Sequence, residues 1–261
     1  MYGVTPSGRR KVRAEKREHA QGSFALLGLE SARGLDMSAP YDEIADWYEG
    51  EFLSDRSESG LPKTDPIGVD GSLTRMLGQG AGPSLEIGCG TGTHAARIRS
   101  LGWSPIGIDL SVGMLRHARN RLPIVRADGE CLPFADALFS SVVSVMVHTD
   151  VPDYPAVLRE AWRVVAPGGC FIHVGVHPCF CGGFADRTDP EAIIIRPGYR
   201  DGHWTKASWT DKGLRDKVGA SHLPLPELLG PFVSAGFVLD GFTEGGAPIP
   251  TVLAMRALKP E

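Results

Sequence analysis

The sequence contains no apolar run approaching the roughly 20 residues that a membrane-spanning helix requires, so we expect no membrane association. The chain of 261 residues has only five cysteines, and five cannot all be paired in disulfides. This argues against a disulfide framework and favours a cytoplasmic location. The 33 glycines and 20 prolines follow no fixed period, which excludes collagen-like and repeat proteins. Because glycine and proline are costly inside helices, they also exclude a coiled coil.

The chain also has little net charge, only −4. That charge is unevenly distributed along the sequence. Residues 1–36 carry seven basic and four acidic side chains, which leaves a net charge of −7 on the remainder. An acidic body argues against a nucleic-acid partner and favours a small-molecule substrate, and we expect a monomer or a homodimer. Residues 1–38 are predicted to form a basic, disordered arm, and Met37 is an alternative start of the natural chain.

After residue 82, short apolar or β-branched segments alternate with amphipathic ones. Strands are predicted at 83–88, 105–109, 124–125, 138–147, 170–176, 236–242 and 251–257, and helices at 91–101, from Ser111 onward, at 153–166 and at 225–235. This alternation predicts an α/β fold with a doubly wound, mostly parallel, Rossmann-like sheet of seven strands. The C-terminal strand is expected to be antiparallel.

One domain is predicted over residues 39–261, in four parts. They are an N-terminal helical cap (41–80, with a helix at 41–52 and a loop at 54–72), a cofactor-binding core (83–177), a lid insertion (178–222), and a C-terminal helix with two strands (223–261). The insertion interrupts the strand–helix rhythm. A long irregular stretch inside a compact domain is typically a functional lid or a binding loop.

A glycine-rich loop, Gly88-Cys89-Gly90-Thr91-Gly92, follows the first predicted strand. Alternate glycines let a ligand approach main-chain N–H groups, and the next helix directs its positive end at that ligand. Asp109 ends the second strand, where an acid faces a ribose, so this chemistry predicts an adenosine-containing cofactor. The dinucleotide fingerprint G-x-G-x-x-G fails at Thr93. Glu86 would repel a pyrophosphate but suits an ammonium group.

Four stretches occur in order between residues 83 and 177: PSLEIGCGTG, GIDLSVGML, ADGECLPF and DYPAVLREAWRVVAPGG. In them the chain resembles the class I S-adenosylmethionine-dependent methyltransferases, in particular the small-molecule, methyltransferase type 11-like branch. The resemblance implies in-line transfer of a methyl group from S-adenosylmethionine to a small-molecule acceptor, with S-adenosylhomocysteine as the product. The cofactor-binding residues that it implies are Tyr41, Glu86, Gly88, Cys89, Gly90, Gly92, Asp109, Leu110, Met114, Asp128, Gly129, Glu130, Met146 and Val147.

The resemblance also implies a role for most of these residues. The glycines would line the methionine part of the cofactor, with Glu86 at its amino group and Asp109 at the ribose hydroxyls. Asp128 would accept from the adenine amino group, and Tyr41 would cover the cofactor. The remaining contacts are those of Leu110 and Met114 with the adenine and of Met146 and Val147 with the methyl donor.

Methyl transfer requires no nucleophilic residue, but an acceptor hydroxyl benefits from a general base, for which histidine is best suited near neutral pH. His148 directly follows the fourth strand, where an open α/β sheet places its ligand crevice, and is the candidate catalytic base. The alternative is a solvated or loop-capping histidine. The candidate substrate contacts are Trp47, His177, Trp204 and His222, with Trp209 as a second tryptophan of the insertion. The alternative for the tryptophans is an anchor of the insertion on the core.

Residue types that can bind zinc lie close together in the sequence at His173, His177, Cys179 and Cys181. The C-x-C spacing is tight for two ligands of one tetrahedral zinc, and His173 lies in an apolar strand, so no metal is expected. Two other functions stay open at this level. One is an NAD(P)-dependent oxidoreductase on a similar sheet, and the other is a non-catalytic cofactor-binding protein.

Overall fold

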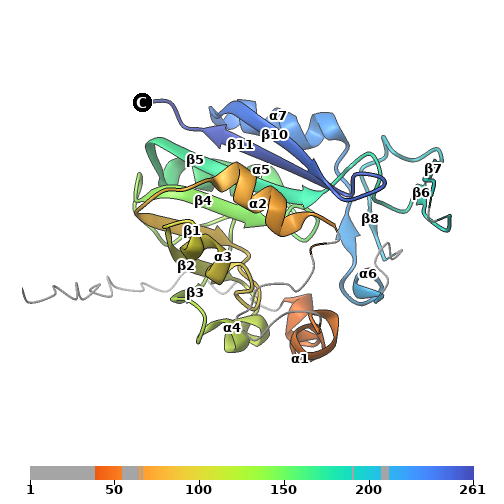
Figure 1. Ribbon diagram of the computed structural model, residues 1–261, viewed down its shortest axis with the longest axis horizontal. Helices are drawn as coiled ribbons and strands as arrows, with labels where there is room; N and C mark the ends of the chain where they lie inside the picture. The colour runs from red at the N-terminus through yellow and green to blue at the C-terminus, as the bar shows by residue number, and fades with distance from the viewer. Residues whose placement is uncertain (1–38, 55–64, 66, 190, 207–211) are drawn as a thin grey trace, which may run out of the picture. The chain divides into compact units, whose positions relative to one another are not determined.

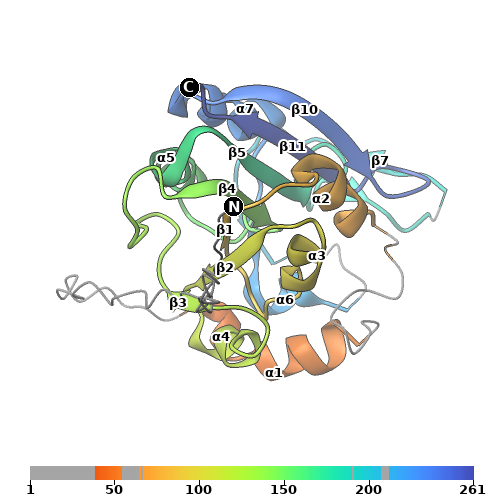
Figure 2. The same ribbon diagram turned by 60° about the vertical axis from the view of Figure 1, so that its left-hand side comes forward.

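A sheet of seven strands dominates the computed structural model, which describes residues 39–54, 65, 67–189, 191–206 and 212–261. The strand order is β10-β11-β5-β4-β1-β2-β3, which Figure 2 shows from top to bottom. β11 is antiparallel to both of its neighbours, and the pairs among β1 to β5 are parallel. This arrangement confirms the predicted doubly wound, mostly parallel sheet. The predicted arm at 1–38 lies outside the described residues.

The strands of this sheet lie close to their predicted positions. They are β1 (Pro83–Ile87), β2 (Ser104–Asp109), β3 (Ile124–Arg126), β4 (Phe139–Val145), β5 (Val165–Val176), β10 (Val238–Gly245) and β11 (Val252–Leu258). The largest difference is in β5, which begins five residues before the predicted start at residue 170. The Pro167–Gly169 segment stays paired because Gly168 donates to Lys259 O (3.0 Å) and Lys259 donates to Gly169 O (2.9 Å).

Helices cover both faces of the sheet, and alternate residues of the central strands point to opposite faces. Val142 of β4 and Phe171 of β5 belong to the core under α5 (Tyr154–Val164) and α7 (Leu225–Ala235). Val143 and Ile172 belong to the opposite core, under α2 (Val69–Leu77) and α3 (Ala95–Ser100). Figure 1 shows α2 in front of the sheet and α7 behind it.

Helices depart from prediction more than strands do. The bounds of α7 are as predicted, but α3 and α5 are shorter than the predicted 91–101 and 153–166. The predicted helix at 41–52 is broken into η1 (Pro40–Asp42), α1 (Ala45–Trp47) and a π-helical turn, η2 (Tyr48–Phe52). The predicted loop at 54–72 is wrong beyond residue 68, because α2 begins at Val69 and buries Leu73 against the sheet.

The insertion at 178–222 is less irregular than predicted. Its described elements are β6 (Ala185–Asp186) paired with β7 (Ile194–Ile195), β8 (Trp204–Thr205) paired with β9 (Ala220–Ser221), and α6 (Leu214–Val218). Ser221 donates to Thr149 O (2.7 Å), which ties β9 to the loop after β4. Across the described ranges, no helix has the length and apolarity needed to cross a membrane.

Candidate active site

The loop after β1 forms the first wall of the site. Gly88, Gly90 and Gly92 all have positive φ angles, of 65°, 53° and 77°, which side-chain-bearing residues rarely adopt. A Cβ on Gly88 would lie 2.5 Å from Val147 Cγ2, so this glycine is required for close packing against the end of β4. A Cβ on Gly90 would have no heavy atom within 4 Å. The loop therefore borders open space at Gly90.

Asp109, at the carboxyl end of β2, holds this loop in place. Its Oδ2 accepts from Gly90 N (2.8 Å), and its Oδ1 accepts from Ser111 N (2.8 Å). Burial raises the pKa of Asp109 above its ordinary value, although both hydrogen bonds oppose that rise. Each carboxylate oxygen has a second lone pair, so Asp109 can still accept from two ligand hydroxyls.

The helix α4 (Val112–Ala118) starts beside this carboxylate, as its sequence predicts. Ser111 is the N-cap and accepts from Met114 N at 3.1 Å, which buries Met114 under the helix start. Asp42, from the N-terminal cap, accepts from Ser111 Oγ (2.7 Å) and Gly113 N (2.8 Å). Burial opposes the ionised form of Asp42, but these hydrogen bonds lower its pKa overall. Asp42 was missed at the sequence level, because only the fold brings it to α4.

A second contact missed by sequence reasoning fixes Tyr41. Its hydroxyl donates to Asp150 Oδ1 (3.0 Å), and Arg215 of α6 donates to the same carboxylate. Arg215 is 4% exposed and also donates to Thr149 Oγ1 (3.1 Å) and Gly219 O (3.1 Å). Burial, reinforced by Asp150, raises the pKa of the Tyr41 phenol well above its ordinary value. The cap, the core and the insertion therefore meet at one carboxylate.

The predicted residues after β3 make local contacts. Asp128 Oδ1 accepts from Glu130 N (2.9 Å), which forms a tight turn at Gly129. Glu130 Oε1 accepts from Asp153 N (3.0 Å), at the N-cap of α5. Asp128 thus stays in the loop just beyond β3, whereas the side chain of Glu130 caps the start of α5.

Four predicted residues lie on β1 or just beyond the ends of β1 and β4: Glu86, Cys89, Met146 and Val147. Glu86, on β1, is only 1% exposed. Burial, reinforced by Glu86 and Asp109, raises the pKa of the Cys89 thiol, which is therefore protonated and a weak nucleophile. Met146, one residue past β4, has φ of 60°, a strained conformation for a residue with a side chain. Its N–H donates to Val174 O (2.7 Å) and fixes the turn toward Val147.

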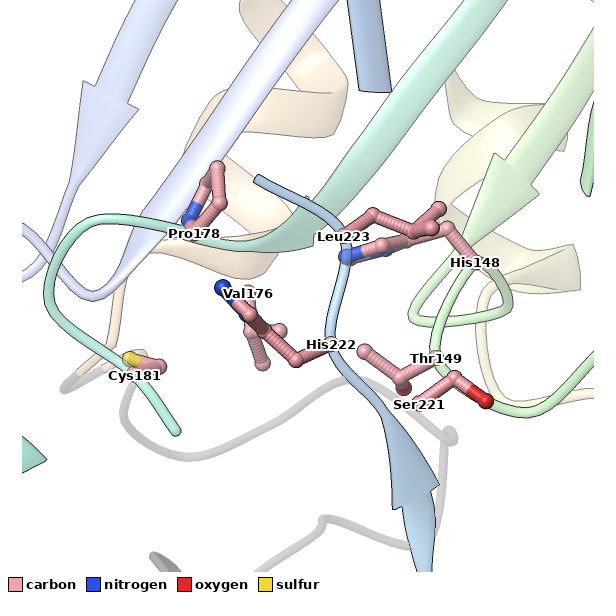
Figure 3. Close-up of a pocket in the computed structure, with 8 residues that line it drawn as sticks. All are labelled: His148, Thr149, Val176, Pro178, Cys181, Ser221, His222 and Leu223. Carbon is pink, nitrogen blue, oxygen red and sulfur yellow. The ribbon is translucent and has the colours of Figure 1, made fainter. Parts of the chain in front are cut away.

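His148 lies where the ends of β4 and β5 meet the insertion, and it borders a small pocket. The described residues that line this pocket are His148, Thr149, Val176, Pro178, Cys181, Ser221, His222 and Leu223. Figure 3 shows the ring of His148 extending toward the segment that carries His222 and Leu223. His148 is 2% exposed and follows Val147, which packs on the glycine loop.

The other candidate substrate contacts are not all brought to this pocket. His222 lines it, but Trp204 is 60% exposed and covers Gly219 instead. His177 is held by Glu244 Oε1 (2.9 Å) and by Cys179 N (3.2 Å). The ring of Trp47 lies 5.8 Å from that of Phe52 and 4.6 Å from Lys217 Nζ, between the cap and α6. Trp209 is outside the described residues.

The candidate zinc ligands have other partners. His173 Nδ1 is 2.7 Å from Tyr154 Oη, and Arg187 donates to Cys181 Sγ (3.2 Å). In the part of the chain that the structure describes, no group of three or more His, Cys, Asp or Glu side chains is arranged to hold a metal ion.

Comparisons with known proteins agree with this geometry. Residues 85–173 match the family described as a methyltransferase domain. The chain is 38% identical over 101 residues to a demethylmenaquinone methyltransferase of Corynebacterium kroppenstedtii, covering 37% of this chain and 44% of that one. It is 33% identical over 199 residues to an uncharacterized protein of Mycobacterium tuberculosis, covering 73% of this chain and 60% of that one. The chain therefore spans about half the length of these relatives.

A solved structure shares the fold. The crystal structure of an S-adenosylmethionine-dependent methyltransferase from Mesorhizobium loti superimposes with a TM-score of 0.60 at 23% sequence identity. The match covers 72% of this chain and 95% of the other.

Proposed function

We propose that this chain, which contains a class I S-adenosylmethionine-dependent methyltransferase domain, transfers a methyl group from S-adenosylmethionine to a small-molecule acceptor. The observation that carries the proposal is the glycine loop after β1, bound through Gly90 N to Asp109 Oδ2. Beside Gly90 there is room that a Cβ would enter without meeting another atom, as expected for a cradle that accepts a ligand.

The donor set suits S-adenosylmethionine better than a dinucleotide. Glu86 is buried next to the loop, where a carboxylate favours an ammonium group and disfavours a pyrophosphate. Asp109 retains acceptor capacity for the ribose hydroxyls, with Leu110 and Met114 toward the adenine. Asp128 is assigned to the adenine amino group.

The methyl-donor end is assigned to the turn after β4. Met146 and Val147 would lie beside the sulfonium, whose positive charge disperses as the methyl group leaves. Such a reaction benefits from a water-poor, aligned site. Tyr41, held by Asp150, would cover the cofactor, and Ser221 and His222 of the insertion would contact the acceptor. The corynebacterial relative is named for a quinone substrate, which supports a small-molecule acceptor.

Calorimetric titration of the full-length protein tests the cofactor assignment. We expect S-adenosylhomocysteine to bind and NADH not to bind. The reverse result would overturn the proposal in favour of an oxidoreductase.

A methyl-transfer assay tests the activity. The protein is incubated with labelled S-adenosylmethionine and a metabolite extract of the source organism, and products are detected by the mass gained with one methyl group. We expect at least one small molecule to be methylated. Binding of S-adenosylhomocysteine without any methylated product would instead indicate a non-catalytic cofactor-binding protein.

A further inference from the structure

Arg121 lies against the glycine loop, on the segment that follows α4. Its Nη1 donates to the carbonyl oxygen of Thr91, in the middle of the loop, at 2.8 Å. The loop packs on the same segment, because a Cβ on Gly92 would lie 2.7 Å from Leu122 Cδ2 and 3.3 Å from Arg121 Cβ. The backbone of this segment is fixed in turn by Arg99 of α3, which donates to the Arg121 carbonyl. The loop therefore rests on a fixed support that carries a cation.

The peptide between Thr91 and Gly92 needs such a support. Thr91 stands between Gly90 and Gly92, and both glycines have positive φ angles. Peptides beside glycine reorient at little steric cost, and their orientation decides which N–H groups of the loop face a ligand. Gly92 N donates to Cys89 O (2.8 Å) and Thr91 O accepts from Arg121, so this peptide is held at both ends. Thr91 is 1% exposed, so water cannot readily replace Arg121 as the donor.

The same guanidinium also binds the N-terminal cap. Glu49, in the π-helical turn η2, accepts from Nη1 of Arg121 (3.1 Å) and from Nη2. The side chains of Arg121 and Glu49 are 34% and 23% exposed, so water shields this ion pair only in part. Burial opposes the ionised form of Glu49, but its hydrogen bonds, first among them that from Arg121, lower its pKa overall. One side chain thus joins the cap to the glycine loop.

We propose that Arg121 is a positioning residue for the cofactor. It holds the peptide between Thr91 and Gly92 in the orientation that accepts the methionine part of S-adenosylmethionine. Glu49 keeps the guanidinium in place for this contact. Asp109 holds Gly90 N in the preceding part of the loop, and Arg121 completes the support. The proposal rests on the proposed methyltransferase function.

A second ion pair between the cap and α4 provides a matched control. Arg116 of α4 donates to Asp46 of the cap at 3.0 Å, and their side chains are 54% and 77% exposed. Within the described ranges, Arg116 makes no hydrogen bond with the glycine loop. Both arginines therefore bind the cap, but only Arg121 also binds Thr91 O. If Arg121 acted only by fastening the cap, replacing either arginine would affect the cofactor in the same way.

Calorimetric titration of the full-length variants with S-adenosylhomocysteine tests the proposal. Arg121→Met removes the guanidinium and should weaken binding by about tenfold, through loss of a hydrogen bond from a charged donor. Glu49→Gln leaves Arg121 on Thr91 O and should weaken binding by no more than about threefold. Arg116→Met should stay within about twofold of wild type.

Two results of this titration would overturn the proposal. Equal losses of affinity in Arg121→Met and Glu49→Gln would show that Arg121 acts through the cap alone. An equal loss in Arg116→Met would show that any contact between cap and α4 has the same effect.

Hydrogen exchange of the ligand-free variants tests the support of the loop without any cofactor. Gly90 N and Gly92 N both donate hydrogen bonds in the loop. Arg121→Met should speed the exchange of residues 88–92, and Arg116→Met should not. Unchanged exchange of these residues in Arg121→Met would overturn the proposal.

A more conservative pair of variants applies if Arg121→Met does not fold. Arg121→Lys keeps the charge opposite Glu49, but a single ammonium lacks the planar fork that reaches both Glu49 oxygens and Thr91 O. Arg116→Lys is then the control. We expect the same order of effects on binding and on exchange, and equal effects in the two variants would contradict the proposal.

Kinetics with any acceptor found in the metabolite extract give a third reading. Arg121→Met should raise KM for S-adenosylmethionine by about the factor that it weakens S-adenosylhomocysteine binding, with little change in kcat, because Arg121 acts on cofactor binding and not on the reacting atoms. A lower kcat with unchanged KM would contradict this role.

The outcomes separate this inference from the proposed function. If wild type binds S-adenosylhomocysteine and Arg121→Met binds it as tightly, only the role of Arg121 is wrong. If wild type does not bind S-adenosylhomocysteine, the proposed function itself fails.

Discussion

Arg215, in the insertion, donates to the carboxylate of Asp150, five residues beyond the end of β4, and Tyr41 from the N-terminal cap donates to the same carboxylate. Three segments far apart in the chain are thus joined at one side chain. Two lysines add to this junction, since Lys217 lies over the ring of Trp47 and Lys212 donates to the Glu51 carbonyl. The junction holds α6 against the cap, beside the carboxyl end of the sheet.

Replacing Arg215 with Met should lower the free energy of unfolding by about 3 kcal/mol, because it leaves the Asp150 carboxylate without its cation. The value is at the low end for a buried pair, since the Asp150 side chain is 18% exposed. Urea unfolding measures it, with Arg116→Gln as the control, whose ion pair with Asp46 is exposed.

A double-mutant cycle makes the test of this junction specific. Asp150→Asn combined with Arg215→Met should lose less stability than the two single variants lose together. Strict additivity would show that the pair is not coupled.

Gly90→Ala should weaken S-adenosylhomocysteine binding by about tenfold or more, since its methyl group would enter the open space beside the loop. The left-handed φ of 53° should also cost about 1–2 kcal/mol of stability. Gly78→Ala is the control, because it too has open space and a positive φ, of 64°, but lies at the end of α2. Its stability should also fall, because φ of 64° with ψ of −178° is a conformation that essentially only glycine adopts, but its binding should be unchanged. Equal loss of binding in both variants would contradict a ligand site at Gly90.

Asp109→Ala should weaken S-adenosylhomocysteine binding by about 1.5–3 kcal/mol, through loss of charge-assisted hydrogen bonds to the ribose. The loop would also lose its bond from Gly90 N to the carboxylate. Calorimetric titration measures the change, and Asp240→Ala, on the edge strand β10, serves as the control. Wild-type affinity in Asp109→Ala would refute the ribose assignment.

Stability should fall in mild acid because of His173. Burial lowers the pKa of His173 from an ordinary 6.5 to about 3. Between pH 6.5 and pH 3 the unfolded chain therefore binds more protons at His173 than the folded chain does. The stability that neutral His173 contributes is fully present above pH 6.5 and is lost as the pH falls toward 3. Between neutral pH and pH 5 the loss from His173 amounts to about 2 kcal/mol.

Urea midpoints for wild type and His173→Gln, taken from pH 7 to pH 5, isolate this contribution from that of the carboxylates. The variant should show the shallower dependence on pH. Parallel curves would mean that His173 does not titrate on unfolding in this range.

The features that the sequence predicts closely depend on interactions between residues near each other in the chain. Strand positions, the Ser111 N-cap and the bounds of α7 depend on alternation, capping and turn residues within a few positions, and all were predicted closely. The helix α2 was missed because its segment, VDGSLTRML, has weak helix propensity. It is helical because Leu73, Met76 and Leu77 are buried against the sheet.

The sequence by itself determined the fold class, the glycine loop after β1 and the acid after β2, because each depends on residues close in the chain. Only the tertiary structure decided which distant side chains meet: Asp42 with α4, Arg215 with Asp150, and His148 with His173. It also left Trp204 exposed and tied His177 to Glu244. Contacts of this kind depend on how strands and helices pack. A pattern of neighbouring residues in the sequence therefore does not predict which distant partner a polar side chain will contact.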